Sequence, residues 1–195
     1  MRPSATDPPK EIADGVWVIR DHRIWLVPNI TIIAGTHSAL VVDTGLGPAN
    51  GEKVLALARR LVGSRKLFLT LTHFHPEHGY GAQIFQSDAT IIYNRAQRDE
   101  LVEKGEHFIE LFRRTQSPAA ASAMQGTKIV MPRFVYDGSS AELDLGDRKA
   151  GCSHLHKAMC PTRLWFAIST LTSVPDIGMS LRTVAPYRRL PSLFG

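Results

Sequence analysis

Residues 71–81 read LTHFHPEHGYG, so His73, His75, Glu77 and His78 fall within six consecutive positions directly after an apolar run. In a strand, residues two apart point to the same side, so His73 and His75 can converge on one ion while His78 addresses a neighbouring position. Neutral imidazole suits zinc, and a carboxylate among such ligands suits a second ion or proton transfer. Three histidines with this spacing therefore favour a metal site over a solvated loop.

The elements around this motif alternate between the two regular periodicities. Short runs rich in Val, Ile and Trp predict an opening antiparallel meander, and apolar residues at i, i+3, i+4, i+7 and i+8 from Val54 predict a helix packed on a sheet. Asn94 is expected to cap a long helix. The mixture indicates an α/β or α+β fold, with strands in 15–21, 23–45, 66–72, 89–94 and 127–148 and helices in 54–62 and 95–114.

The composition is that of a globular domain. The chain has 195 residues, of which 44% are hydrophobic and 21% charged. Residues 1–147 carry 16 Lys and Arg against 17 Asp and Glu (net −1), whereas residues 148–195 carry 7 against 1 (net +6). Because the basic excess is confined to this tail, we expect no nucleic-acid partner. No signal-like segment or apolar run of roughly 20 residues occurs, so we expect a cytoplasmic protein without a membrane partner.

The motif HFHPEH resembles the His-x-His-x-Asp-His metal motif of the metallo-β-lactamase-fold hydrolases, and VVDTG at residues 41–45 is similar to the segment that packs under that motif. The resemblance covers residues 15–147. It implies an α+β fold, the four-layer αββα sandwich, with metals in a cleft between the sheet edges. It further implies that His73 and His75 bind a first zinc ion, that His78 and Glu77 belong to a second, and that Asp43 supports the ligands without binding metal.

Two of these residues have more than one reading. Glu77 stands where the family usually has Asp, so its longer side chain serves in ligation or proton transfer only if the loop adjusts. Asp43, which follows a predicted strand, is explained equally well by an ordinary Asx turn.

The tail departs further from the family. The family's Gly-His-x-Pro/Gly segment, bridging Asp and last His do not occur after Asp147. Our hypothesis is that residues 148–195 are a frame-shifted translation of the family's second half, since the codons of residues 157–161, read from the third base of the lysine codon, can spell Gly-His-Val-Pro. A competing reading is a separate metal site, although its spacing matches no zinc finger; its ligands would be Cys152, His154, His156 and Cys160. A disulfide between the two cysteines is disfavoured, because nothing indicates an oxidising compartment.

The resemblance implies zinc-dependent hydrolysis of a small-molecule ester, thioester, lactone or lactam, with two zinc ions in a complete site. The alternative is a catalytically inactive partial domain that binds one metal weakly or none. If the domain ends near residue 147, the apolar strands at residues 30–33 and 67–71 are expected to stay partly exposed, which favours aggregation.

Overall fold

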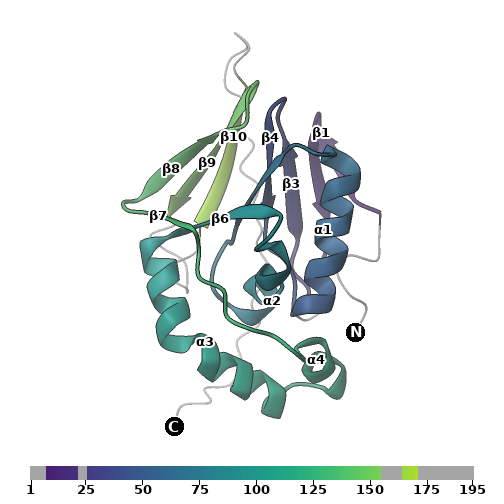
Figure 1. Ribbon diagram of the computed structural model, residues 1–195, viewed down its shortest axis with the longest axis vertical. Helices are drawn as coiled ribbons and strands as arrows, with labels where there is room; N and C mark the ends of the chain where they lie inside the picture. The colour runs from purple at the N-terminus through teal and green to yellow at the C-terminus, as the bar shows by residue number, and fades with distance from the viewer. Residues whose placement is uncertain (1–7, 22–25, 155–163, 171–195) are drawn as a thin grey trace.

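Two β-sheets form the framework of the protein (Figure 1). A computed structural model describes residues 8–21, 26–154 and 164–170, with side chains through Cys152. The larger sheet has seven strands in chain order: β1 (Lys10–Ala13), β2 (Val16–Ile19), β3 (Ile30–Ala34), β4 (Ser38–Val42), β5 (Lys66–Thr70), β6 (Ala89–Asn94) and β7 (Phe134–Tyr136). The smaller sheet has the order β10-β9-β8 and consists of β8 (Ser140–Asp144), β9 (Arg148–His154) and β10 (Leu164–Thr170).

The large sheet changes direction at its centre. Strands β1 to β4 pair antiparallel, which confirms the predicted meander, and β4 to β7 pair parallel. Parallel neighbours bring the carboxyl ends of β4 and β5 to the same edge of the sheet. The segments that follow these two strands contain Asp43 and the histidine motif, so the topology itself brings them together.

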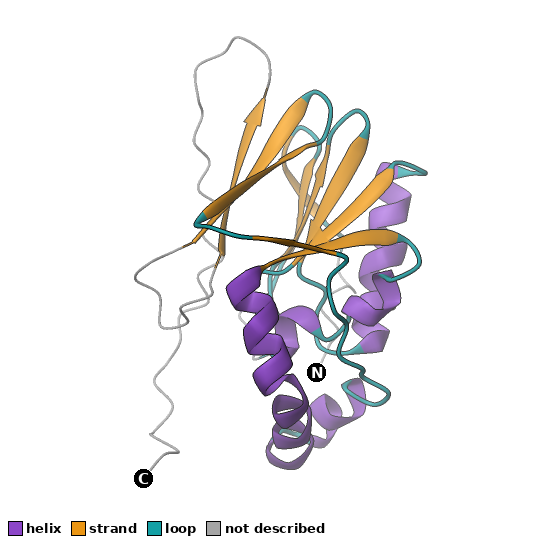
Figure 2. Ribbon diagram, turned by 60° about the vertical axis from the view of Figure 1, so that its left-hand side comes forward, coloured by secondary structure: helices purple, strands orange, loops and turns teal. Residues whose placement is uncertain are grey.

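Helices cover one face of the large sheet, and the small sheet lies on the other (Figure 2). The predicted helix near Val54 is longer than its apolar pattern, because Pro48 at its first turn begins it six residues earlier. Asn94 caps the long helix as predicted, its side chain accepting a hydrogen bond from the Ala96 backbone. The helices are α1 (Pro48–Val62), α2 (Pro76–Gly79), α3 (Arg95–Thr115) and α4 (Pro118–Ala123), with the 3-10 turn η2 (Ala82–Phe85).

The central strands are buried on both faces. All five residues of β3 and of β4 are buried. Ile32 and Val41 pack towards the helices, while their neighbours Ile33 and Leu40 pack against the small sheet. The expectation that residues 30–33 and 67–71 stay partly exposed is therefore wrong for β3 and for most of β5, of which only Lys66 is exposed and Phe68 half-buried. The residues that cover this face are Ala150 and Cys152 of β9 and Leu145 of the turn between β8 and β9, with Leu143 of β8 beside them.

The two sheets are fastened together at the edge opposite the histidine motif. Arg148, at the start of β9, is 6% exposed and donates to the backbone oxygen of Asp14 in the β1–β2 turn. Its other terminal nitrogen lies 3.3 Å from Oδ2 of Asp14 and 3.2 Å from Oδ2 of Asp147. Asp147 in turn accepts from the backbone N–H of Thr36 at 2.9 Å. A buried guanidinium thus joins the turns of both sheets; we call these four residues the Arg148 network.

Together these elements confirm the predicted α+β class. The described residues form the helix layer and the two sheet layers of the expected αββα sandwich.

Candidate metal centre

The histidine motif lies where the chain leaves β5 and turns into α2. Pro76 begins this short helix, and the backbone N–H groups of His78 and Gly79 donate to the carbonyl of His75 at 3.0 and 3.1 Å. The turn is also attached to the end of β4, because the Thr44 backbone donates to the carbonyl of His78 at 2.7 Å. The rigid parallel strands therefore set the positions of the histidines.

His73, Glu77 and His78 form a cluster with the geometry of a metal site. One ligand atom from each lies within 4.8 Å of the other two. His78 Nε2 is 4.0 Å from Glu77 Oε1, and the rings of His73 and His78 are 4.0 Å apart between centroids. The structure thus brings together three of the four motif residues singled out from the sequence. Their division between two metal ions remains a prediction.

His75 lies beside this cluster but outside the 4.8 Å group. Its ring is 4.5 Å from that of His73 and packs nearly parallel to the ring of Phe108 on α3, at 5.6 Å and 23°. Phe74 meets both of these rings edge-on. Phe108 of α3 therefore holds the His75 ring in place. The spacing of residues in the sequence could not predict this contact.

Asp43 lies beneath the histidines and is fully buried. Its Oδ1 accepts the Thr72 backbone N–H at 2.7 Å, and its Oδ2 lies 2.8 Å from His78 Nδ1. The residue has a φ of 69°, a conformation that is uncommon for a residue other than glycine. The carboxylate therefore contacts the candidate ligand His78 directly, beyond what an Asx turn requires.

Thr72 is a residue of the site that the sequence analysis did not predict. Its hydroxyl lies 2.9 Å from Asp43 Oδ2, 3.0 Å from His73 Nδ1 and 3.1 Å from His78 Nδ1. The available signal was its place between the end of a buried strand and the first histidine, where a buried hydroxyl needs partners.

A second threonine and two glycines hold the turn after the motif. The Thr44 hydroxyl donates to the carbonyl of His78 at 3.0 Å and accepts from the Gly81 backbone at 3.1 Å. Gly81 packs against Gly51 of α1 so closely that a Cβ on Gly51 would lie 2.3 Å from the Gly81 oxygen. The contact between α1 and the turn is thus backbone against backbone.

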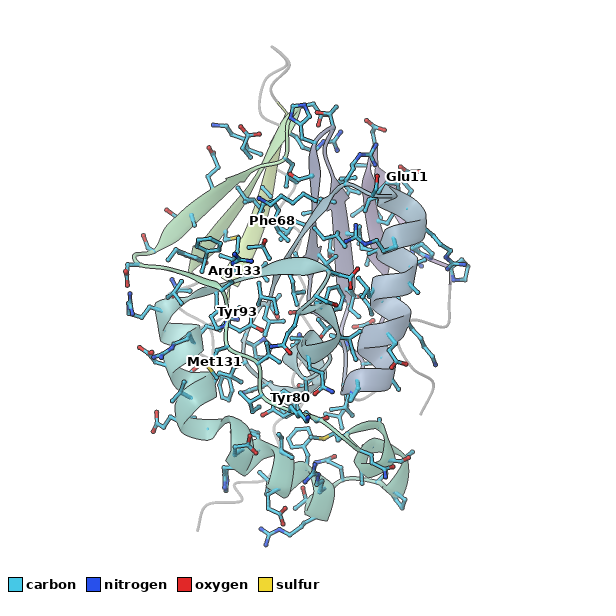
Figure 3. All side chains as sticks on the ribbon, in the orientation of Figure 1. Glu11, Phe68, Tyr80, Tyr93, Met131 and Arg133 are labelled. Carbon is cyan, nitrogen blue, oxygen red and sulfur yellow. The ribbon has the colours of Figure 1, made fainter. Side chains whose placement is uncertain are left out.

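Helix α3 is attached to the motif by buried polar groups. The Tyr80 hydroxyl donates to the carbonyl of Gly105 at 2.8 Å, and the Gln97 side chain donates to the carbonyl of Leu71 at 3.0 Å. Burial raises the pKa of Tyr80 well above its ordinary value, with smaller contributions from Glu106 and Glu77. Tyr80 and Tyr93 are labelled in Figure 3. Tyr93, on β6, is fully buried, and burial raises its pKa as well. Both phenols therefore stay neutral at physiological pH.

The competing tail site falls largely outside the described residues, which do not include His156 and Cys160. Cys152 is a free, buried thiol on β9, and desolvation raises its pKa from 9.0 to about 12. A thiol in this environment is a poor ligand, because metals bind the thiolate.

Residues 23–159 match the family model of the metallo-beta-lactamase superfamily. Because the match spans more than half of the chain, the protein belongs to this superfamily. A search of curated proteins finds no match.

Solved structures share the fold. A metallo-β-lactamase with a HARLDQ motif from Cronobacter sakazakii is 14% identical with a TM-score of 0.61, over 83% of this chain and 60% of that one. FEZ-1 from Legionella gormanii is 16% identical with a TM-score of 0.60, over 84% and 58%. A B3 metallo-β-lactamase described as having an active-site glutamic acid is 15% identical with a TM-score of 0.59, over 86% and 59%. The chain thus spans about three fifths of the length of these structures.

None of the helices in the described part of the chain has the length and apolar character that a membrane crossing requires.

Proposed function

We propose that this protein carries the amino-terminal part of a zinc hydrolase site whose complete form cleaves a small ester, thioester, lactone or lactam. One observation carries the proposal: the ligand atoms of His73, Glu77 and His78 lie within 4.8 Å of one another, with a buried carboxylate contacting one of the imidazoles from behind. Superfamily membership supports the reaction class.

The donor set fits zinc. Two imidazoles and a carboxylate are the ligand types of catalytic zinc sites, which leave one position open. Glu77 Oε2 is buried and has no hydrogen-bond partner among the described residues. A buried carboxylate oxygen without a partner is costly, and a cation at the cluster would remove that cost.

In this mechanism, a bound zinc ion supplies Lewis-acid polarisation of a carbonyl group and a nucleophile at neutral pH. His73 and His78 would hold the ion, and Asp43 orients the His78 ring from behind. Glu77 would be the third ligand through one carboxylate oxygen, and its other oxygen could take a proton from the attacking water. A solved member of the fold with an active-site glutamic acid supports a role for glutamate at such a site. Phe74 and Phe108 pack against the His75 ring on this side of the cluster.

A second candidate is a partial domain with little activity. It is favoured because the chain spans about three fifths of the matched structures. In addition, His73, Glu77 and His78 are the only such cluster of potential metal ligands among the described residues. Three ligands suffice for one ion, whereas two-metal hydrolysis uses a symmetric clamp of two ions about 3.5–4 Å apart.

Zinc content and turnover of purified protein test the proposal together. We expect one weakly bound zinc per 195-residue chain and hydrolysis of model esters and β-lactams near background. A version with the alternative reading frame restored after about Lys149 is expected to gain both zinc and turnover. His75→Ala should abolish that gain, because the sequence predicts His75 as a ligand of the first ion in the complete site. A chain that binds no zinc would contradict the metal site. Zinc-dependent turnover by the unrestored chain would contradict the partial-domain alternative and show that ligands come from outside the described residues.

A further inference from the structure

We infer that Thr72 is a positioning residue: its hydroxyl passes the influence of Asp43 to His73, so that one carboxylate sets the tautomer of both His73 and His78. The inference rests on the proposed metal site, because it concerns how the ligands of that site are prepared. Three distances carry it: Asp43 to His78, Asp43 to Thr72, and Thr72 to His73. Each contact is a hydrogen bond only if a proton lies on one particular atom.

The contact between Asp43 and His78 requires a proton on the imidazole. Asp43 Oδ2 and His78 Nδ1 are 2.8 Å apart, and an ionised carboxylate can only accept hydrogen bonds. His78 therefore carries a proton on Nδ1. In the neutral ring the lone pair then lies on Nε2, the nitrogen that is 4.0 Å from Glu77 Oε1.

Thr72 extends this logic to the second imidazole. Its hydroxyl oxygen is 2.9 Å from Asp43 Oδ2, and this contact is a hydrogen bond only if the single hydroxyl proton points at the carboxylate. The oxygen then has only lone pairs to offer to His73 Nδ1, at 3.0 Å. His73 must therefore also carry its proton on Nδ1, which leaves its Nε2 available to a metal ion.

The opposite arrangement is unfavourable. If the hydroxyl donated to His73 Nδ1, the buried Asp43 oxygen would face a bare hydroxyl oxygen at 2.9 Å, which costs the charge-assisted bond and adds repulsion. Hydrogen bonds to an ionised acceptor are roughly twice as strong as neutral ones, so the proton stays with Asp43. Both histidines are thus set to bind through Nε2 before any metal arrives.

The matched variants are Thr72→Val, Thr72→Ser and Thr70→Val. Valine has the shape of threonine without the hydroxyl, and serine keeps the hydroxyl. Thr70 is the last residue of β5, two residues before Thr72, and it is buried. Its hydroxyl oxygen has no hydrogen-bond partner among the described residues, so Thr70→Val is a control for the loss of a buried hydroxyl.

The first readout is the tautomer state of the zinc-free chain, observed through nitrogen-15 shifts of labelled histidine rings at a pH where imidazole is neutral. Comparison with a His73→Ala spectrum assigns the His73 signals. The wild type, Thr72→Ser and Thr70→Val should show His73 protonated on Nδ1, whereas Thr72→Val should show a mixture of tautomers. Zinc affinity, measured by competition with a chelator, should fall about 10–100-fold in Thr72→Val alone, which is the usual effect of losing a group that orients a ligand.

The outcomes separate this inference from the proposed function. If the His73 ring is protonated on Nε2 in the wild type, or if Thr72→Val leaves its tautomer unchanged, the role inferred for Thr72 is wrong but the metal site is not affected. Equal losses of zinc affinity in Thr70→Val and Thr72→Val would also contradict that role, since the effect would then be one of packing. Failure of the wild type to bind zinc contradicts the proposed function, while the tautomer measurement still tests the role of Thr72.

Discussion

Asp43 and Arg148 are both ionisable and almost fully buried, and they lie at opposite ends of the strands. Asp43 adjoins the large sheet, and Arg148 begins β9 of the small sheet. Asp43 follows the carboxyl end of β4 and contacts Thr72 and His78. Arg148 contacts turns at the other end of the strands, where Asp14 and Asp147 are largely exposed. The acid contacts the candidate metal ligand His78, whereas the base joins two sheets.

The difference shows how to read buried charge in this fold. A charge whose partners can also bind a ligand prepares a site, and one whose partners are turn backbone and exposed carboxylates stabilises packing. If this division is right, substitutions at the two positions should affect different measurements.

The largest effect is expected from Asp43→Ala. It leaves the Thr72 N–H and the His78 ring without their buried acceptor and places alanine at a φ of 69°. We expect a loss of about 3–5 kcal/mol in the free energy of unfolding together with loss of zinc binding. Asp43→Asn tolerates the backbone conformation and serves as the control, with a smaller stability loss and about 10–100-fold weaker zinc binding. Unchanged zinc affinity in Asp43→Asn would break the comparison.

Arg148→Met should act on stability alone. Methionine keeps much of the apolar stem but cannot bond the Asp14 backbone, so we expect a loss of about 1–3 kcal/mol by denaturant unfolding. Because the Arg148 network lies at the far edge of the sheet, zinc affinity should stay at the wild-type value. A parallel loss of zinc affinity would mean that the two edges are not independent.

The pH dependence of stability tests the burial of the Cys152 thiol between the two sheets. Desolvation raises the pKa of Cys152 from 9.0 to about 12, so the thiol ionises more readily in the unfolded chain. Its contribution to stability is complete below about pH 9 and declines as the pH rises through about 12. We expect the free energy of unfolding to fall by about 1 kcal/mol between pH 8 and 10, and this slope to be shallower in Cys152→Ala. Identical slopes in the two proteins would show that the thiol is not desolvated.

The smallest expected effect is the interaction energy between Asp43 and Arg148, which should be close to zero. In a double-mutant cycle of Asp43→Asn and Arg148→Met, the stability losses should add to within about 0.5 kcal/mol, since the residues share no contact partner among the described residues. A coupling well beyond that value would show that strain passes along β4 from one edge to the other.

Much of the site could be predicted from local pattern. The histidine motif, the apolar strand before it and the Asn94 cap are each encoded within a few consecutive residues. The structure confirms the cap, and it places ligand atoms of His73, Glu77 and His78 within 4.8 Å of one another, whereas the predicted ligand His75 lies outside this group. The superfamily and the α+β class were confirmed as well.

What could not be predicted depends on contacts between distant segments. The stacking of Phe108 on His75 joins α3 to the motif, and the burial of β3 depends on side chains of the small sheet more than a hundred residues later in the chain. Thr72 looked like a strand residue, because its role appears only when Asp43 is brought under it by the parallel pairing of β4 and β5. The origin of residues 148–195 remains a hypothesis for nucleotide sequencing.

The backbone contact between Gly51 and Gly81 has a consequence for laboratory evolution of this protein. A Cβ on Gly81 would lie 2.9 Å from the Gly51 Cα and from the Thr44 oxygen, and neither of these backbone atoms can rotate away. In a library of random variants, substitutions at both glycines should therefore be removed at the folding step, whatever their effect on catalysis. Side chains on α3 near the histidines, such as Phe108, are not part of this backbone contact. Selection for new substrates should therefore favour substitutions there.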